Sequence, residues 1–167
     1  MSGDVIELIL ADHRRFEDLF RRLRDNSEDR VGALRDLAEL LVAHAEAEEG
    51  EVYPALRRFQ DIDAHEVEHG AEEHAEGHQA LLALMEVGDP EAPDWDAKLE
   101  DLVKAINHHL DEEERTILNS ARDTVPEQRR VELGERFVEA RAARVSAGCG
   151  DISHVRDLVE QTKHRVD

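Results

Sequence analysis

Histidines and carboxylic acids recur at intervals of four residues along this chain of 167 residues. The pairs are His44–Glu48, His74–His78 and His109–Glu113, and one further histidine, His13, stands near the start of the chain. In an α-helix, residues i and i+4 lie on one face with their Cβ atoms about 6 Å apart, so each pair can direct two ligands at one centre. Because imidazole and carboxylate groups are metal ligands, the spacing predicts a buried cation site.

The elements that position these residues are helices, because apolar side chains recur with a period close to 3.6 residues over most of the chain. The pattern predicts helices at about residues 3–24, 30–59, 64–87 and 95–123. The polar connections between them are short, and Asp63 and Asp94 are placed to cap the third and fourth helices. Short connections make neighbouring helices antiparallel, so we predict an all-α fold, an up-down-up-down four-helix bundle.

The residues after Pro126 predict one or two extra helices. Apolar positions indicate a fifth helix around residues 131–138 and a shorter sixth around residues 152–159. We therefore divide the chain into residues 1–125, the bundle with the metal site, and residues 126–167, a C-terminal helical extension. The extension is expected to pack on the bundle or at an oligomer interface.

In each bundle helix, polar residues stand where the pattern requires apolar ones. His109 and Glu113, for example, lie on the apolar stripe between Ile106 and Ile117. A buried carboxylate without a partner costs several kcal/mol or more, so these breaks need a compensating group. Two carboxylates and five histidines are too many ligands for one tetrahedral zinc ion, but they suit two octahedral ions with open positions for oxygen species. This ligand mixture favours iron, with manganese the less favoured choice.

Over roughly residues 4–123 the chain resembles the hemerythrin-like family, also called the HHE cation-binding domain. The family places a histidine on the first helix, His-x3-Glu on the second, a histidine often followed by another on the third, and a histidine with a nearby carboxylate on the fourth. The matching residues, which the resemblance implies as metal ligands, are His13, His44, Glu48, His74, His78, His109 and Glu113. The implied cofactor is a pair of non-haem iron ions joined by an oxo or hydroxo bridge.

One departure from the family bears on function. The oxygen-carrying members have His-x4-Asp on the fourth helix, whereas this chain has His-x3-Glu at His109 and Glu113. The resemblance therefore favours the bacterial non-carrier members, whose partners are O₂, peroxide, nitric oxide and iron itself. It implies an oxidoreductase, for example with catalase- or peroxidase-like activity, or alternatively an iron or oxygen sensor or iron-handling protein without turnover.

Two other classes of protein fit the sequence less well. A helical interaction domain without metal would leave the buried polar residues uncompensated. The ferritin-like class requires an inward Glu-x-x-His on each of two helices, and Glu66-x-x-His69 is the one place that fits.

Several polar residues near the predicted site receive a different interpretation. His108 and Glu112 also have the four-residue spacing, but they lie about 100° round the helix from His109, so we expect them in solvent. Tyr53 precedes Pro54, where a kink is expected. We expect Tyr53 at an end of the bundle, with a hydrogen bond to the site or ligation as a phenolate as the alternatives.

The remaining polar residues are expected outside the coordination sphere. Glu48 and Glu113 are expected to bridge the two ions. Glu49 and Glu114, which follow them in the sequence, are expected near the metal without binding it. The other histidines are expected at the surface, and they are His65, His69, His154 and His164.

Composition excludes several other functions. The formal net charge is −20, which opposes binding to nucleic acid or to anionic membranes. No apolar run reaches the ~20 residues that a membrane span needs, and no signal peptide is visible. One cysteine, Cys149, excludes an internal disulfide framework, so we expect a cytoplasmic protein. The oligomeric state is not determined by the sequence.

Removal of metal should destabilise the protein strongly. Without cations, two carboxylates and five imidazoles face one another in an apolar core, so metal binding adds directly to the free energy of folding. Thermal unfolding with and without a strong chelator measures the effect. Equal unfolding midpoints, after metal analysis confirms removal, would contradict the predicted site.

Overall fold

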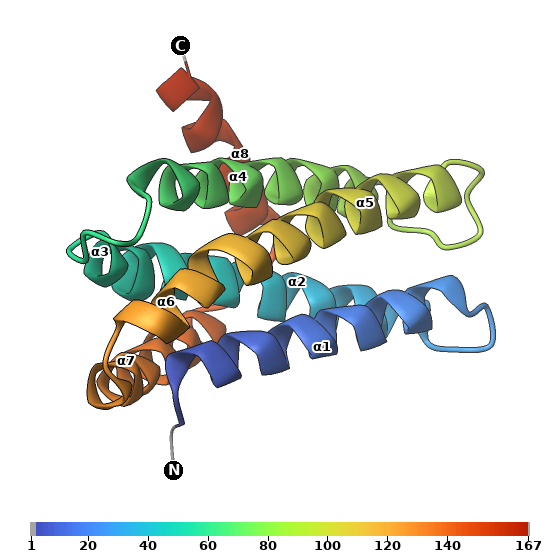
Figure 1. Ribbon diagram of the computed structural model, residues 1–167. Helices are drawn as coiled ribbons and strands as arrows, with labels where there is room; N and C mark the ends of the chain where they lie inside the picture. Colours follow the sequence, from blue (N-terminus) through green and yellow to red (C-terminus); the bar gives the residue numbers. More distant parts are fainter. Residues whose placement is uncertain (1–2, 167) are drawn as a thin grey trace.

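The structure is a computed structural model that describes the backbone of residues 3–166 and the side chains of residues 3–163. Within this part of the chain every regular element is helical. The long helices predicted for the bundle are α1 (Val5–Arg24), α2 (Arg30–Ala47), α4 (Ala64–Val87) and α5 (Trp95–Glu113). They form two antiparallel hairpins, α1–α2 and α4–α5, that pack against each other (Figure 1). The predicted four-helix bundle is therefore confirmed.

The caps agree with the sequence in part. Asp63 caps α4, because its side chain accepts a hydrogen bond from the backbone N–H of His65. Asp94 occupies the cap position of α5, but its side chain makes no capping hydrogen bond there.

Two of the bundle helices change their winding at the level of the predicted site. The helix α2 passes into a π-helical turn, η1 (Glu48–Val52), and then into α3 (Tyr53–Leu56). In the same way α5 passes into η2 (Glu114–Leu118) and then α6 (Asn119–Thr124). The second bundle helix thus ends at Leu56, short of the predicted residue 59. The π turns were not predicted.

The spacing of the buried residues explains the π turns. His44, Glu48, Val52 and Leu56 are all buried and follow one another in steps of four. In an α-helix each such step turns about 400°, so repeated steps drift by about 40° each round the helix. A π turn is wider, because its hydrogen bonds span five residues, and it reverses this drift. The buried face therefore stays continuous through the site.

The C-terminal residues form both of the extra helices that the sequence predicted, α7 (Glu127–Ser146) and α8 (Ile152–Val166). The helix α7 packs against α1, α2 and η1, and α8 packs against α4 (Figure 1). Leu133 and Phe137 of α7 are buried in the core at one end of the bundle. Between the two helices, Gly150 lies so close to α2 that a Cβ atom there would be 2.7 Å from the backbone nitrogen of Glu39.

Among the described residues, none of the helices is both long and apolar enough to cross a membrane.

The packing of α7 on the bundle yields a prediction about stability. The Phe137 side chain is fully buried, and its ring meets the His44 ring edge-on at 5.5 Å between centroids. Phe137→Ala should therefore lower the free energy of unfolding by about 3–5 kcal/mol in urea titrations. Val138→Ala, at the half-buried neighbouring position, should cost about 1 kcal/mol or less. Equal costs for the two variants would contradict this docking of α7.

Candidate metal centre

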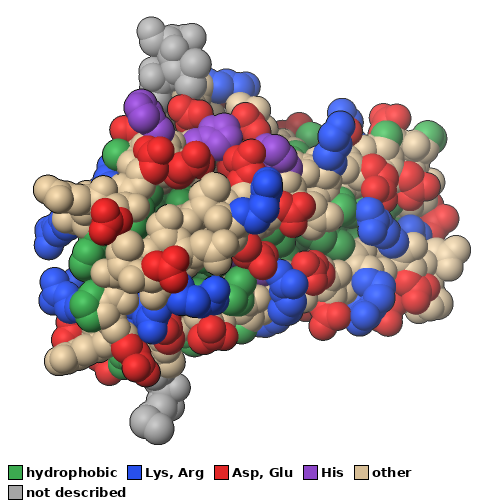
Figure 2. Space-filling model, in the orientation of Figure 1, with side chains coloured by type: hydrophobic (Ala, Val, Ile, Leu, Met, Phe, Trp, Pro, Cys, Tyr) green, Lys and Arg blue, Asp and Glu red, His purple; other side chains and the backbone are tan. Residues whose placement is uncertain are grey.

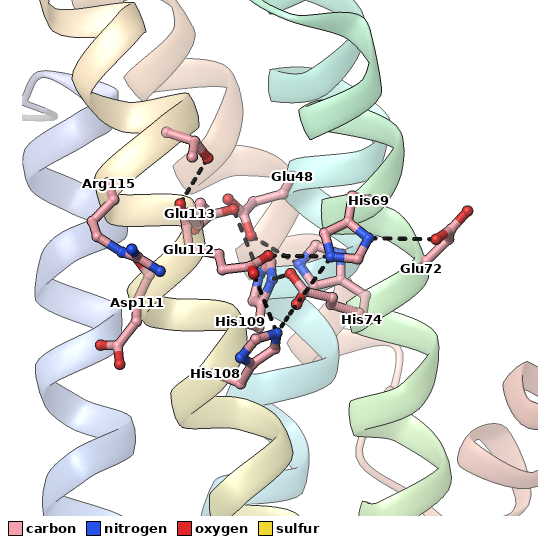
Figure 3. Close-up of polar contacts among 12 residues, drawn as sticks. Glu48, His69, Glu72, His74, His108, His109, Asp111, Glu112, Glu113 and Arg115 are labelled. Atoms are coloured by element: carbon pink, nitrogen blue, oxygen red, sulfur yellow. Dashed lines mark hydrogen bonds and ion pairs between the residues drawn. The ribbon is translucent and has the colours of Figure 1, made fainter.

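Two buried carboxylates, Glu48 and Glu113, occupy the middle of the bundle. Their side chains are fully buried, and they come from the junctions of α2 with η1 and of α5 with η2. The imidazoles of four helices converge on them, and Figure 3 shows His74 and His109 beside the two glutamates. Ligand atoms of Glu48, His74, His109 and Glu113 lie within 4.8 Å of one another, and so do those of His13, His44 and Glu113.

Each carboxylate is held between two imidazole Nε2 atoms. The distances are 2.9 Å for His44–Glu48, 3.2 Å for His74–Glu48, 3.1 Å for His13–Glu113 and 3.6 Å for His109–Glu113. Both hairpins therefore contribute to both carboxylates. The site ties the two halves of the bundle together.

The opposite ring nitrogen, Nδ1, of each of these histidines meets a further carboxylate. The distances are 2.8 Å for His44–Asp12, 3.0 Å for His13–Glu114, 3.1 Å for His109–Glu73 and 3.4 Å for His74–Glu49. A carboxylate at Nδ1 keeps the proton on that atom of the neutral ring and leaves the Nε2 lone pair facing the centre. This carboxylate–histidine arrangement is the one that orients histidine ligands in metal sites.

In the absence of a cation, the site balances its charge with protons. Burial alone would lower the pKa of His44, but the charges and hydrogen bonds of Glu48 and Asp12 raise it to about 9. Burial would also lower the pKa of His74, but Glu48 and Glu49 raise it to about 10. Burial would raise the pKa of Glu48, but His44 and His74 hold it well below its usual value. The protonated imidazole rings thus supply the positive charge that a metal ion would supply.

The donor set fits a metal. Among the buried atoms at the centre, Nε2 of His109 and Oε2 of Glu48 form no hydrogen bond with the described residues. Leaving a buried polar atom unsatisfied costs about 1–3 kcal/mol. Imidazole and carboxylate atoms that converge in this way are suitable ligands for divalent first-row metals.

Tyr53 corrects the sequence analysis. We expected it at an end of the bundle, but its side chain is buried, its hydroxyl donates to Oε2 of Glu113, and its ring stacks on His74. The π turn is the reason, because the Tyr53 N–H bonds to the carbonyl of Glu48 five residues earlier. In an α-helix these residues would lie about 140° apart, whereas a five-residue hydrogen bond places Tyr53 over Glu48. Gly70 leaves room for the phenol.

His78 is buried beside the cluster without joining either group of converging ligands. Its Nε2 atom has no hydrogen-bond partner within the described structure. Burial, followed by the nearby charge of His74, lowers the pKa of His78 to about 4, so its ring is neutral. Its role as a ligand remains a prediction, as do the ligand roles of the other predicted residues.

Sequence reasoning missed the supporting carboxylates Asp12 and Glu73 and the arginine Arg141. Asp12 contacts His44 through one oxygen and Arg141 of α7 through the other. Burial would raise the pKa of Asp12, but His44 and Arg141 lower it. A signal for the carboxylates was present, because an acidic residue directly precedes the histidine in both Asp12-His13 and Glu73-His74. No local pattern marks Arg141, which is distant in sequence.

The other polar residues lie mostly as expected. Glu49 and Glu114 contact the Nδ1 atoms of His74 and His13, outside the converging ligand atoms. His65, His69 and His108 are exposed. His154 is half-exposed and contacts Glu46, and the side chain of His164 lies outside the described residues.

Comparison with known proteins identifies the family and agrees with the fold. Residues 4–121 match the sequence profile of the family described as Hemerythrin HHE cation binding domain. In the crystal structure of a Hemerythrin HHE cation binding domain-containing protein from Mycobacterium kansasii, an Rv2633c homolog, the fold superposes with a TM-score of 0.77 at 21% identity. That match covers 92% of this chain and 98% of the other.

A second relative is a longer protein that the match covers only in part. It is a protein of Nostoc sp. (strain PCC 7120) named DNA nickase, 25% identical over 142 residues. The match covers 83% of this chain but 39% of the relative, so this chain spans about two fifths of that protein's length.

The raised pKa values of His44 and His74 predict how pH affects the metal-free protein. A group whose pKa is raised on folding stabilises the fold below its unfolded pKa, here 6.5, and that contribution is lost as pH rises through about 9 and 10. Metal-bound imidazoles are neutral, so the loaded protein does not depend on these protons. The gap in unfolding temperature between loaded and chelated protein should therefore widen from pH 6.5 to 10. A gap that narrows with rising pH would contradict the site's electrostatics.

Proposed function

This chain belongs to the hemerythrin HHE cation-binding domain family, and we propose that it holds two non-haem iron ions that bind or react with O₂, peroxide or nitric oxide. The observation that supports the proposal is the central pair Glu48 and Glu113, each placed between two imidazole nitrogens at 2.9–3.6 Å. Two carboxylates that each face both hairpins suit two ions better than one.

The residues that would hold the ions are those that converge at the centre, namely His13, His44, Glu48, His74, His109 and Glu113. The mixture of imidazole and carboxylate favours iron over manganese in this proposal. A bound iron pair supplies a Lewis acid and a source or acceptor of electrons. The protein's own contribution is to orient the ligands, exclude water and hold protons.

The dimensions of the site favour a very small substrate. A cavity beside the cluster has a volume of about 10 Å³, which is room for about one water molecule. Its walls combine apolar side chains such as Phe16 and Ile106 with His74, His78 and His109. A space this small is far from admitting an organic substrate, which leaves species of a few atoms such as O₂, peroxide and nitric oxide.

Two residues of the chain are placed to handle protons and access. His78 lines both the inner cavity and a surface groove of about 700 Å³ between α4, α8 and η1, so the proposed route into the site passes it. Its neutral ring can accept a hydrogen bond at Nε2 from an incoming peroxide. Burial and then the charges of Glu113 and Glu48 raise the pKa of Tyr53 well above its usual value. In the metal-free site Tyr53 therefore keeps its proton, and its hydroxyl donates a hydrogen bond to Glu113.

The proposal does not include nucleic acid. The net charge of −20 would repel a phosphate backbone, and the DNA nickase relative extends well beyond the matched region. We place the protein in the cytoplasm, where a free buried thiol such as Cys149 stays reduced.

A sensor of iron or oxygen is the second candidate, and one contact favours it. Arg141 of α7 contacts Asp12, which in turn contacts His44 at 2.8 Å. A change at the metal can therefore reach the C-terminal helices through two polar contacts.

Iron content tests the proposal first. Iron-loaded wild-type protein should hold about two iron ions per chain, with near-ultraviolet absorption from a ferric pair. His109→Ala removes a buried imidazole from the centre, so its iron content and absorption should fall substantially. His65→Ala, at an exposed histidine of α4, is the matched control and should retain both. Loss of iron in the control, or full retention in His109→Ala, would contradict the assigned ligands.

Peroxide consumption separates the two candidates. The enzyme proposal predicts that the iron-loaded protein consumes many peroxide molecules per chain, and that metal-free protein consumes none. Consumption that stops after a single equivalent would contradict turnover and favour the sensor. Oxygen-electrode and peroxide assays on the same preparation provide the measurement.

A further inference from the structure

A second cluster of potential ligands lies outside the bundle core, on the face that α4 and α5 form together. It consists of His69 and Glu73 on α4 and His108 and Glu112 on α5, one pair with four-residue spacing on each helix. Figure 2 shows histidines among acidic side chains over these helices, and Figure 3 shows His69, His108 and Glu112 gathered together. The sequence analysis placed His108 and Glu112 in solvent, and His69 at the surface. Their convergence follows from the pairing of the two helices.

The imidazole–carboxylate distances within this outer cluster are close enough for the four residues to share one metal ion. Nε2 of His69 lies 3.6 Å from Glu73 and 3.1 Å from Glu112, and Nε2 of His108 lies 3.1 Å from Glu73 and 3.3 Å from Glu112. Around a zinc ion with bonds of about 2.0–2.1 Å, neighbouring tetrahedral ligand atoms lie about 3.3–3.4 Å apart. These four separations, which reach different oxygens of Glu112, are near the spacing of ligand atoms around zinc, and one ligand atom from each residue lies within 4.8 Å of the others.

Glu73 distinguishes the cluster from a set of surface ion pairs. Its side chain is 4% exposed, and Oε2, the oxygen that faces the outer histidines, has no hydrogen-bond partner among the described residues. The other oxygen, Oε1, is engaged 3.1 Å from Nδ1 of His109. A buried carboxylate oxygen without a hydrogen bond needs a positive charge beside it, and a metal ion held by the two imidazoles that face it would supply that charge.

His69 is also oriented as a metal ligand. Its Nδ1 atom lies 3.5 Å from Glu72, and its Nε2 atom faces the cluster (Figure 3). A carboxylate at one ring nitrogen directs the lone pair of the other toward a metal.

We propose that His69, Glu73, His108 and Glu112 form a second, surface site for a divalent cation, with zinc the best match to two imidazoles and two carboxylates. This site goes beyond the iron chemistry proposed above and does not require iron at the centre. Glu73 joins the two sites, because one of its oxygens serves the outer cation and the other orients His109 at the centre.

The test is a zinc titration of the full-length, iron-loaded protein by calorimetry, with Co²⁺ as a spectroscopic substitute. Wild-type protein should bind one equivalent of Zn²⁺ more than the His69→Ala/His108→Ala double variant. The double variant should bind that equivalent at least about 100-fold more weakly. Co²⁺ at the site should give the intense visible bands of a tetrahedral ion, and the double variant should lack them. The substituted side chains are exposed, so the variant should fold, and circular dichroism checks this.

His65→Ala is the matched control, because His65 and His69 form the neighbouring four-residue pair on α4. If zinc binding is lost in His65→Ala, the ligands are that pair and the proposed site is wrong. If the double variant binds as many equivalents as the wild type with equal affinity, the proposal is also overturned. Because the comparison is between variants, it holds whether or not the inner site contains iron.

Discussion

The burial of two carboxylates in the middle of a helical bundle is the constraint on which the rest of this structure depends. Glu48 and Glu113 are excluded from solvent, and an ionised carboxylate in such a place requires positive charge and hydrogen-bond donors around it. The four imidazoles provide the donors, and a cation or added protons provide the charge. The π turns, the stacked Tyr53 and the carboxylates behind each histidine all follow from the need to hold these groups in register.

The two hairpins meet this requirement in nearly the same way and then diverge. Asp12 behind His44 corresponds to Glu73 behind His109, and both carboxylates come from the residue just before a central histidine. The outer oxygen of Asp12 meets Arg141, whereas that of Glu73 meets exposed histidines. One half of the site is therefore covered by α7, whereas the other half has exposed histidines at its outer edge. The contacts that lead from His44 through Asp12 to Arg141 therefore lie on one side of the site, and the proposed zinc site lies on the other.

Much of the fold could be predicted from the sequence, because the 3.6-residue pattern specifies the helices and short connections specify their order. The inward orientation of His109 and the outward orientation of His108 could also be predicted, since a helix fixes both. Tyr53 was misplaced because the prediction assumed α-helical winding through a π turn. The convergence of His69 with His108, and the reach of Arg141 to Asp12, depend on how helices pack together, which the periodicity of a single helix does not specify.

The central claim is that two metal ions lie between Glu48 and Glu113. Anomalous X-ray scattering from crystals of the protein as isolated, measured on both sides of the iron absorption edge, tests it most directly. The account predicts two iron peaks at the centre of the bundle, flanked by the imidazoles of both hairpins. A single peak, or none at the bundle centre in protein shown to contain iron, would contradict it.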